Sequence, residues 1–202
     1  MWRVAAAVGL ACAARCAADM PAVDSSAPGE FSWLAGAEEI VIEDHWIGYG
    51  PASPAMADYT LRREGGDFVG KAAFSVGGHF RPKAKKDSCE VRVPGAAAAE
   101  FLKMLAGCAS REGEYKPAMD HTDDYPKVRI TLREGDRAVV FRSESQGEFH
   151  APWAVEQDGK TRVVDADAPG RALKALEPHL AKERVRALTK EVEGGGQRGD
   201  DL

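Results

Sequence analysis

The sequence predicts an α+β fold, in which two main helices pack on one face of an antiparallel sheet. Short segments of alternating apolar and polar residues, separated by glycine turns, predict the strands. Two longer segments, with apolar residues three and four positions apart, predict the helices. The chain has 202 residues, a length that suits one domain with a substantial core.

The first half of the predicted domain is a group of strands followed by a helix. The expected elements, in order, are a strand over 38–47, a hairpin of 57–63 and 67–76, a strand over 89–93 and a helix over 96–109. Glu64-Gly65-Gly66 makes the hairpin turn, and Pro94-Gly95 separates the last strand from the helix. The basic segment over 77–87 is expected to be a polar connection.

The second half also has a hairpin, further strands and then a helix. Its expected elements are a hairpin of 127–133 and 137–143, a strand that starts at Pro152-Trp153, a strand over 161–164 and a helix up to about 193. Asp167 is the expected N-cap of that helix, and Pro169 lies in its first turn. Pro178 is expected to kink or split it.

Several residues recur at one spacing in the two halves. Thr60-Leu61-Arg62 and Thr131-Leu132-Arg133 are 71 residues apart (131 − 60), and Val93 with Val164 has the same spacing. This spacing leads to the hypothesis of a duplicated βββα unit over 57–109 and 128–180. Two such units, joined edge to edge, would leave the sheet face opposite the helices free.

The N-terminal residues predict export. Residues 1–18 combine one early arginine, an apolar stretch and a small-residue end, the pattern of a signal peptide, so we expect a periplasmic or secreted protein. A lipid anchor through Cys12 or Cys16 is the less favoured alternative. Residues 19–30 then form a flexible leader, 31–193 a single α+β domain and 194–202 a disordered tail.

The charge of the chain excludes one class of partner. The formal net charge is −5, which gives no electrostatic drive toward nucleic acid. No apolar segment reaches the roughly 18–20 residues that a membrane-spanning helix needs.

Two cysteines follow the predicted signal peptide. Cys89 opens the predicted strand over 89–93, and Cys108 ends the helix that returns from it, so both thiols are expected near one end of a β-α unit. We therefore expect a disulfide between Cys89 and Cys108, with two buried free thiols as the alternative.

A polar segment before the second hairpin is a candidate metal site. Asp120, His121, Asp123 and Asp124 bring three carboxylates and an imidazole into five residues, donors that suit Ca²⁺ or Zn²⁺. The spacing matches no EF-hand loop, so a solvated loop with Asx-turns is the alternative.

Four aromatic residues are candidates for a binding surface, because exposed aromatic side chains anchor interfaces. They are Trp46, Tyr49, Tyr125 and Trp153. Burial in the core is the default alternative for the two tryptophans.

No catalytic motif accompanies these features, since the sequence has no serine elbow, zinc-binding histidine pair or phosphate-binding loop. We therefore expect a non-catalytic binding or inhibitory module that contacts a protein or envelope component. The alternatives are a metal-assisted hydrolase or Ca²⁺-stabilised domain centred on Asp120–Asp124, and a structural envelope protein. Apart from such a metal, no cofactor is expected.

Overall fold

The computed structural model describes residues 29–50, 52–77, 84–119 and 123–194. The predicted signal peptide, most of the predicted leader and most of the predicted tail lie outside these residues. The strands are β1 (Glu39–Ile47), β2 (Ala55–Glu64), β3 (Asp67–Val76), β4 (Lys85–Val93), β5 (Tyr125–Glu134), β6 (Arg137–Ser143), β7 (Trp153–Gln157) and β8 (Lys160–Val164). The helices are α1 (Gly95–Ala106), α2 (Ala168–Leu176) and α3 (Lys182–Gly194), with short 3₁₀ helices η1 (Ser32–Gly36) and η2 (Glu177–His179).

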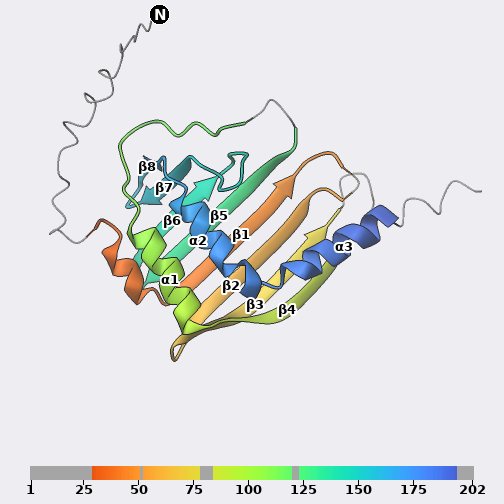
Figure 1. The fold of residues 1–202 in the computed structure, drawn as a ribbon, viewed down its shortest axis with the longest axis horizontal. Helices are drawn as coiled ribbons and strands as arrows, with labels where there is room; N and C mark the ends of the chain where they lie inside the picture. The colour runs from red at the N-terminus through yellow and green to blue at the C-terminus, as the bar shows by residue number, and fades with distance from the viewer. Residues whose placement is uncertain (1–28, 51, 78–83, 120–122, 195–202) are drawn as a thin grey trace, which may run out of the picture.

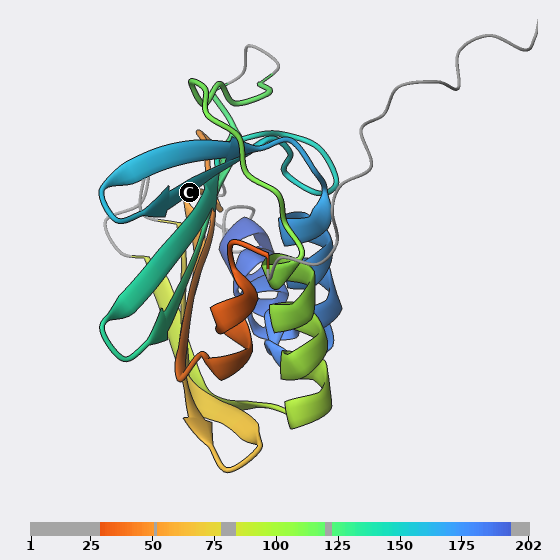
Figure 2. The ribbon, with the colours of Figure 1, turned by 90° about the vertical axis from the view of Figure 1, so that its left-hand side faces the viewer.

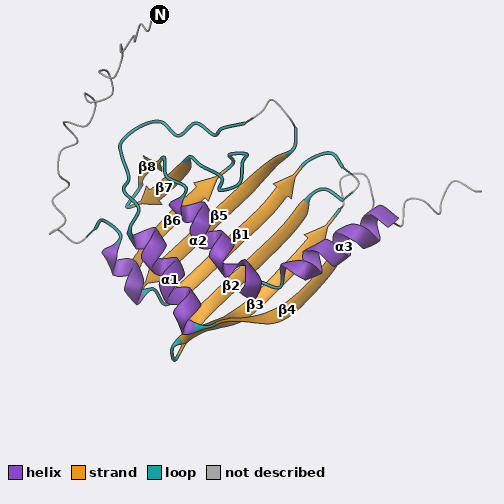
Figure 3. Cartoon of the chain, viewed as in Figure 1, coloured by secondary structure: helices purple, strands orange, loops and turns teal. Residues whose placement is uncertain are grey.

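The eight strands form one antiparallel sheet in the order β4-β3-β2-β1-β5-β6-β7-β8, and the predicted α+β class is confirmed (Figures 1 and 3). Each half of the chain contributes four consecutive strands that pair with their neighbours. The two halves meet where β1 pairs with β5, with Ile40 opposite Leu132. The sheet therefore runs without interruption through both halves.

Helices cover one face of this sheet (Figure 2). Helix α1 packs against η1, α2 and β3, and α3 lies along β2, β3 and β4. The strands present alternate side chains to the helices, as the sequence pattern predicts. On β1, for example, Ile40 and Ile42 are fully buried, whereas Val41 between them is partly exposed.

Side chains from both halves make up the core. Phe101 and Leu105 of α1, together with Leu173 and Leu176 of α2, are buried with the inward residues of the strands. Phe31, just before η1, packs edge-on against Phe141 of β6, with ring centroids 5.4 Å apart. Each half thus depends on the other for burial of its apolar face.

One local prediction needs correction. Strand β4 begins at Lys85, not at Cys89, because Lys85 to Ser88 pair with β3 as far as Val76. Asp167 is the N-cap residue of α2, as predicted, but its side chain makes no cap hydrogen bond and instead accepts one from Arg171. The break at Pro178 is as predicted, since η2 separates α2 from α3.

The repeated tripeptides occupy matching positions beside β1. Leu61 of β2 and Leu132 of β5 both lie opposite Ile40, on its two sides. Arg62 and Arg133 both lie opposite Glu39 in the same registers. The shared sequence therefore reflects a shared environment, in which a leucine is buried and an arginine pairs with a glutamate.

Candidate functional site

The two ends of the sheet differ in how they connect the strands. At one end, tight turns at Gly65 and Gly135, both with positive φ, join β2 to β3 and β5 to β6. At the other end lie the longer connections from β1 to β2, from β3 to β4 and from β6 to β7, together with the segment that leads into β5. We call this second end the loop end.

Three large apolar side chains are exposed at the loop end. Trp46 is 48% exposed, Tyr49 is 58% exposed and Met119 is 37% exposed. Trp46 is the second-last residue of β1, Tyr49 follows β1, and Met119 precedes β5. Among the described residues these are the large apolar side chains that remain exposed, so the exposed apolar surface is concentrated at this end.

Hydrogen bonds connect these segments. The Asp124 carboxylate accepts a hydrogen bond of 3.0 Å from the backbone N–H of Tyr49. The side-chain amide of Gln146, from the β6–β7 connection, donates to the carbonyl of Asp124 at 2.7 Å, and the backbone N–H of Gln146 donates to Ala118. Three separate connections are thereby held together at the loop end.

Tyr125 lies beside the exposed aromatics. It is half-buried and pairs with Ile47 in the ladder between β1 and β5, one step from the pairing of Trp46 with Pro126. The predicted binding residues Trp46, Tyr49 and Tyr125 therefore gather at one end of two neighbouring strands.

Trp153 is separate from this group and belongs to the core. Its side chain is fully buried, and its indole N–H donates to the carbonyl of Phe149 at 2.9 Å. The first three residues of β7 are all buried, because β7 is paired on both sides and covered on both faces. A tryptophan in that position stabilises packing and is not available to a partner.

The predicted metal site is only partly within the described residues. Asp120 and His121 lie outside them, whereas Asp123 and Asp124 are exposed. No group of three histidine, cysteine, aspartate or glutamate side chains in the described part of the chain has the arrangement of a metal site. Asp124 has a structural contact, since its carboxylate binds the Tyr49 amide.

The expected disulfide between Cys89 and Cys108 is not formed in the structure. Cys89 and Cys108 are both free thiols, one half-buried and one buried. The expectation placed Cys89 at the start of a five-residue strand, but it lies in the middle of β4, and α1 packs on η1, α2 and β3. Burial raises the pKa of Cys108 to about 11, so its thiol is protonated at neutral pH.

A cluster of charges lies beneath the exposed Trp46. The ammonium of Lys182, at the start of α3, is 2.7 Å from an oxygen of Asp44 on β1 and 2.8 Å from an oxygen of Glu177 on η2. Burial alone would lower the pKa of Lys182, but attraction to Asp44 and Glu177 outweighs it and raises the pKa. Lys182 therefore stays charged and ties α3 to the sheet.

Two adjoining cavities open on either side of this cluster, and both are lined by Asp44, Glu177 and Lys182. One, of about 260 Å³, reaches Trp46, Val185 and Arg186. The other, of about 200 Å³, is lined by polar side chains that include those of Glu148, His150 and Lys174. Neither Lys182 nor its role was found from the sequence, because the three charged residues are distant along the chain.

The His150 side chain does not form a catalytic pair with a neighbouring serine. The Ser143 hydroxyl donates to the backbone carbonyl of His150 at 2.5 Å, and the imidazole Nδ1 lies 3.2 Å from the carbonyl of Ser145. His150 also has a positive φ of 54°. These contacts shape the β6–β7 connection and hold it against the end of the sheet.

The sheet face away from the helices carries ion pairs across neighbouring strands. Glu39 contacts Arg133 at 2.7 Å and Arg62 at 3.4 Å. His45 contacts Asp58 at 2.7 Å, while the adjacent Asp44 points to the opposite face and binds Lys182. This face is polar, and the exposed apolar surface lies instead at the loop end.

Comparison of the chain with protein-family models, with curated proteins and with solved structures gives no match. In the part of the chain that the structure describes, no helix combines the length and the apolar character needed to cross a membrane.

Proposed function

We propose that this chain is a non-catalytic binding module that contacts a protein partner through its loop end. The observation that carries this proposal is the joint exposure of Trp46 and Tyr49 on an end of the sheet where hydrogen bonds hold the connections together. Tryptophan, tyrosine and methionine are enriched in protein interfaces, and the first two dominate interface energetics.

The surroundings of these aromatics favour an interface over an active site. Trp46 borders an open cavity that Val185 and Arg186 also line, so an apolar contact and a positive charge lie side by side. Arg186 makes no ion pair with any residue that the structure describes. A partner with an apolar side chain next to a carboxylate would satisfy both groups.

Export to the periplasm or the extracellular space is part of this proposal, and the partner would then be a protein of the envelope or the surroundings. An inhibitory role is one form that such binding would take. The proposal also includes the duplication of a βββα unit over 57–109 and 128–180. Strands followed by a helix in both ranges support it, with three strands (β2 to β4) in the first range and four (β5 to β8) in the second.

Site-specific photo-crosslinking in the producing cells tests the proposed surface. A photoreactive phenylalanine at position 49 is expected to yield one discrete adduct of higher mass. The same group at Asp136, in the turn between β5 and β6 at the other end of the sheet, is the control and is expected to yield none. The change Trp46→Ser should remove most of the adduct, because it deletes the neighbouring contact.

Two results would contradict the proposal. One is the absence of an adduct from position 49 while the protein is folded and correctly exported. The other is an adduct that forms equally from position 136 or persists fully in the Trp46→Ser variant.

A further inference from the structure

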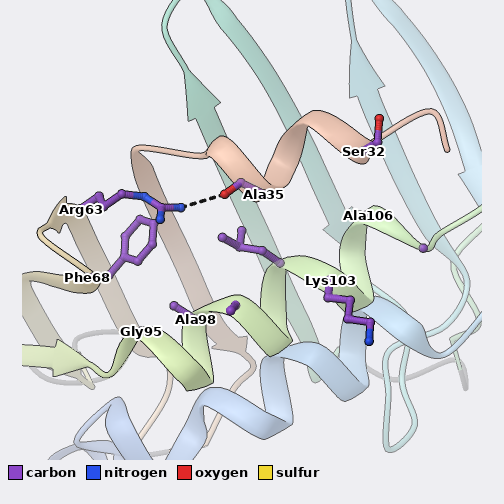
Figure 4. Close-up of a pocket in the computed structure, with 12 residues that line it drawn as sticks. Ser32, Ala35, Arg63, Phe68, Gly95, Ala98, Lys103 and Ala106 are labelled. Atoms are coloured by element: carbon purple, nitrogen blue, oxygen red, sulfur yellow. Dashed lines mark hydrogen bonds between the residues drawn. The ribbon is translucent and has the colours of Figure 1, made fainter. Parts of the chain in front are cut away.

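A second surface feature lies at the opposite end of the sheet from the loop end. It is a groove of about 410 Å³ between η1, the turn from β2 to β3 and helix α1 (Figure 4). Its volume lies within the range of roughly 300–1,000 Å³ that is typical of small-molecule sites. The proposed protein-binding surface does not include it.

Small side chains of α1 leave this space open. Ala98, Ala99, Leu102 and Ala106 line the groove from α1, at helical spacings that place them along one side. Ala35 of η1 faces them (Figure 4). Alanine side chains are too short to fill the space between α1 and η1, so a groove remains, in which Ala99 is exposed and Ala106 is half-buried while Ala98 and Leu102 are buried.

One end of the groove is closed by close packing. The start of α1 touches the turn from β2 to β3, since a Cβ on Gly95 would lie 2.4 Å from the carbonyl oxygen of Gly66. The backbone N–H of Gly95 is bonded to Asp67 at 2.9 Å, and Arg92 also binds Asp67. The Asp67 carboxylate is therefore already paired, and it does not line the groove.

Arg63 stands at this closed end as a fixed cation. Its guanidinium lies over the ring of Phe68, 4.9 Å from the centroid, and donates to the carbonyl of Ala37 at 2.8 Å. It also donates to the carbonyl of Ala35 at 3.1 Å (Figure 4). A guanidinium has five N–H groups, so these two bonds leave others available. The protein thus orients the Arg63 side chain without using all of its hydrogen-bond donors.

The charges of the lining select for an anion. Arg63 and Lys103 are the charged residues that line the groove, and both are cations, although the whole chain has a formal net charge of −5. Lys103 forms no ion pair with another described residue. Among the described residues, the lining of this apolar channel has cations and no carboxylate, which complements a ligand that has an apolar body and one negative group.

We propose that this groove binds a single-chain fatty acid, with the acyl chain along α1 and the carboxylate at Arg63. The groove follows α1 from Gly95 to Gly107, about 18 Å at the helical rise of 1.5 Å per residue. That length favours an unbranched chain over a compact ligand. The carboxylate pairs with the unused N–H groups of Arg63, and the chain covers the alanine side of α1.

Calorimetric titration of the full chain with decanoate, below its micelle concentration, tests this proposal. Decanoate is expected to bind with saturation at one site. Acetate has the same carboxylate without the chain, and decyltrimethylammonium has the same chain with the opposite charge. Both are expected to bind at least about tenfold more weakly, because each lacks one of the two recognised features.

Variants assign the binding to the groove. Ala99→Trp fills it from an exposed position on α1 and is expected to weaken decanoate binding at least about tenfold. Ala138→Trp places the same side chain on an exposed alanine of β6 and is the matched control, with no change expected. Arg63→Gln is expected to weaken decanoate binding and to strengthen the weak binding of the cationic analogue, because it removes a positive charge that repels the analogue.

Three outcomes would overturn the proposal. The first is the absence of saturable decanoate binding to the unaltered chain. The second is binding that survives Ala99→Trp, with circular dichroism showing that the variant is folded. The third is a concentration-dependent dimer that Ala99→Trp dissociates while decanoate has no effect, because the occupant would then be a second copy of the chain.

Discussion

The hydroxyl of Tyr59 is a polar atom enclosed by the core without a hydrogen-bond partner. Its side chain is fully buried and packs against Phe74 with ring centroids 6.0 Å apart. No described residue accepts or donates a hydrogen bond at the Tyr59 oxygen. Burial, together with the negative charge of Asp44, raises the pKa of this phenol well above its ordinary value.

The Tyr59→Phe variant is expected to be more stable than the unaltered protein. Removal of an unpaired buried hydroxyl saves its desolvation cost, so the free energy of unfolding should rise by about 1 kcal/mol. Urea denaturation followed by circular dichroism measures the change. A loss of stability would instead indicate that the hydroxyl has a partner, such as an ordered water.

Gly70 on β3 is a position where a side chain has no space. A Cβ there would lie 1.9 Å from the carbonyl oxygen of Thr60 on the neighbouring strand. Gly70→Ala is therefore expected to lower the free energy of unfolding by about 1–3 kcal/mol, because the backbone of β2 or β3 must shift. Gly50→Ala is the matched control, since nothing lies within 4 Å of a Cβ at Gly50.

The two free thiols predict how the protein responds to reducing agents. With Cys89 and Cys108 unpaired, dithiothreitol should leave the urea midpoint unchanged, and thiol titration of the unfolded chain without residues 1–18 should detect two thiols. A disulfide between them would instead add about 3 kcal/mol to the free energy of unfolding, and reduction would remove this contribution. That second result would show that the arrangement of β4 and α1 differs from the one described.

Among the helices, α3 depends most on polar contacts for its position. Two residues within it, Leu188 and Val192, are buried, whereas Lys182 and Arg184 bind Asp44 and Asp87 on the sheet. The helix covers β2, β3 and β4 and borders the cavity next to Trp46. Its attachment therefore shapes one side of the proposed binding surface.

Lys182→Met is expected to lower the free energy of unfolding by about 2 kcal/mol, because it leaves Asp44 and Glu177 without their shared cation. In this variant, amide hydrogen exchange should accelerate more in α3 than in α1. Lys190→Met, on the exposed side of the same helix, is the control and should have little effect. If the amide hydrogens of α3 exchanged at the same rate in Lys182→Met and in Lys190→Met, the result would show that Lys182 does not anchor the helix.

For the whole molecule, acid sensitivity follows from several paired carboxylates. Hydrogen bonds from basic side chains lower the pKa of four acidic groups, which are Asp67 with Arg92, Asp87 with Arg184, Glu148 with Lys174 and Asp165 with Arg111. A carboxyl group with a lowered pKa in the folded state binds protons less readily than in the unfolded state. Its stabilisation is present above the unfolded pKa of about 4 and is lost as the pH falls through the folded pKa.

The urea midpoint is therefore expected to stay level near neutral pH and to decrease as the pH falls below about 4. Asp67→Asn should make this decrease shallower, because one of the linked groups no longer titrates. Asp136→Asn, an exposed turn residue without an ion pair among the described residues, is the control. If the urea midpoint of Asp67→Asn decreased with falling pH as steeply as that of the unaltered protein, the result would contradict the assigned pairing with Arg92.

The sequence by itself determined the kind and order of most elements. Alternation of apolar residues placed β1, β2, β3, β5 and β6 to within a few residues, because a half-buried strand needs a period of two. Glycine turns placed both hairpins, and Pro178 placed the break before α3, since these residues restrict the backbone locally. Such signals act over a few residues and need no knowledge of distant neighbours.

The tertiary structure alone decided which side chains meet. Trp46 and Trp153 look alike in sequence, but Trp153 lies on a strand covered on both faces and Trp46 lies at an open end. Lys182 contacts Asp44, which lies far from it along the chain. Cys89 and Cys108 do not form a disulfide, because the start of β4 and the direction of α1 determine where each cysteine lies. Burial and contact depend on elements distant in sequence, which no local pattern records.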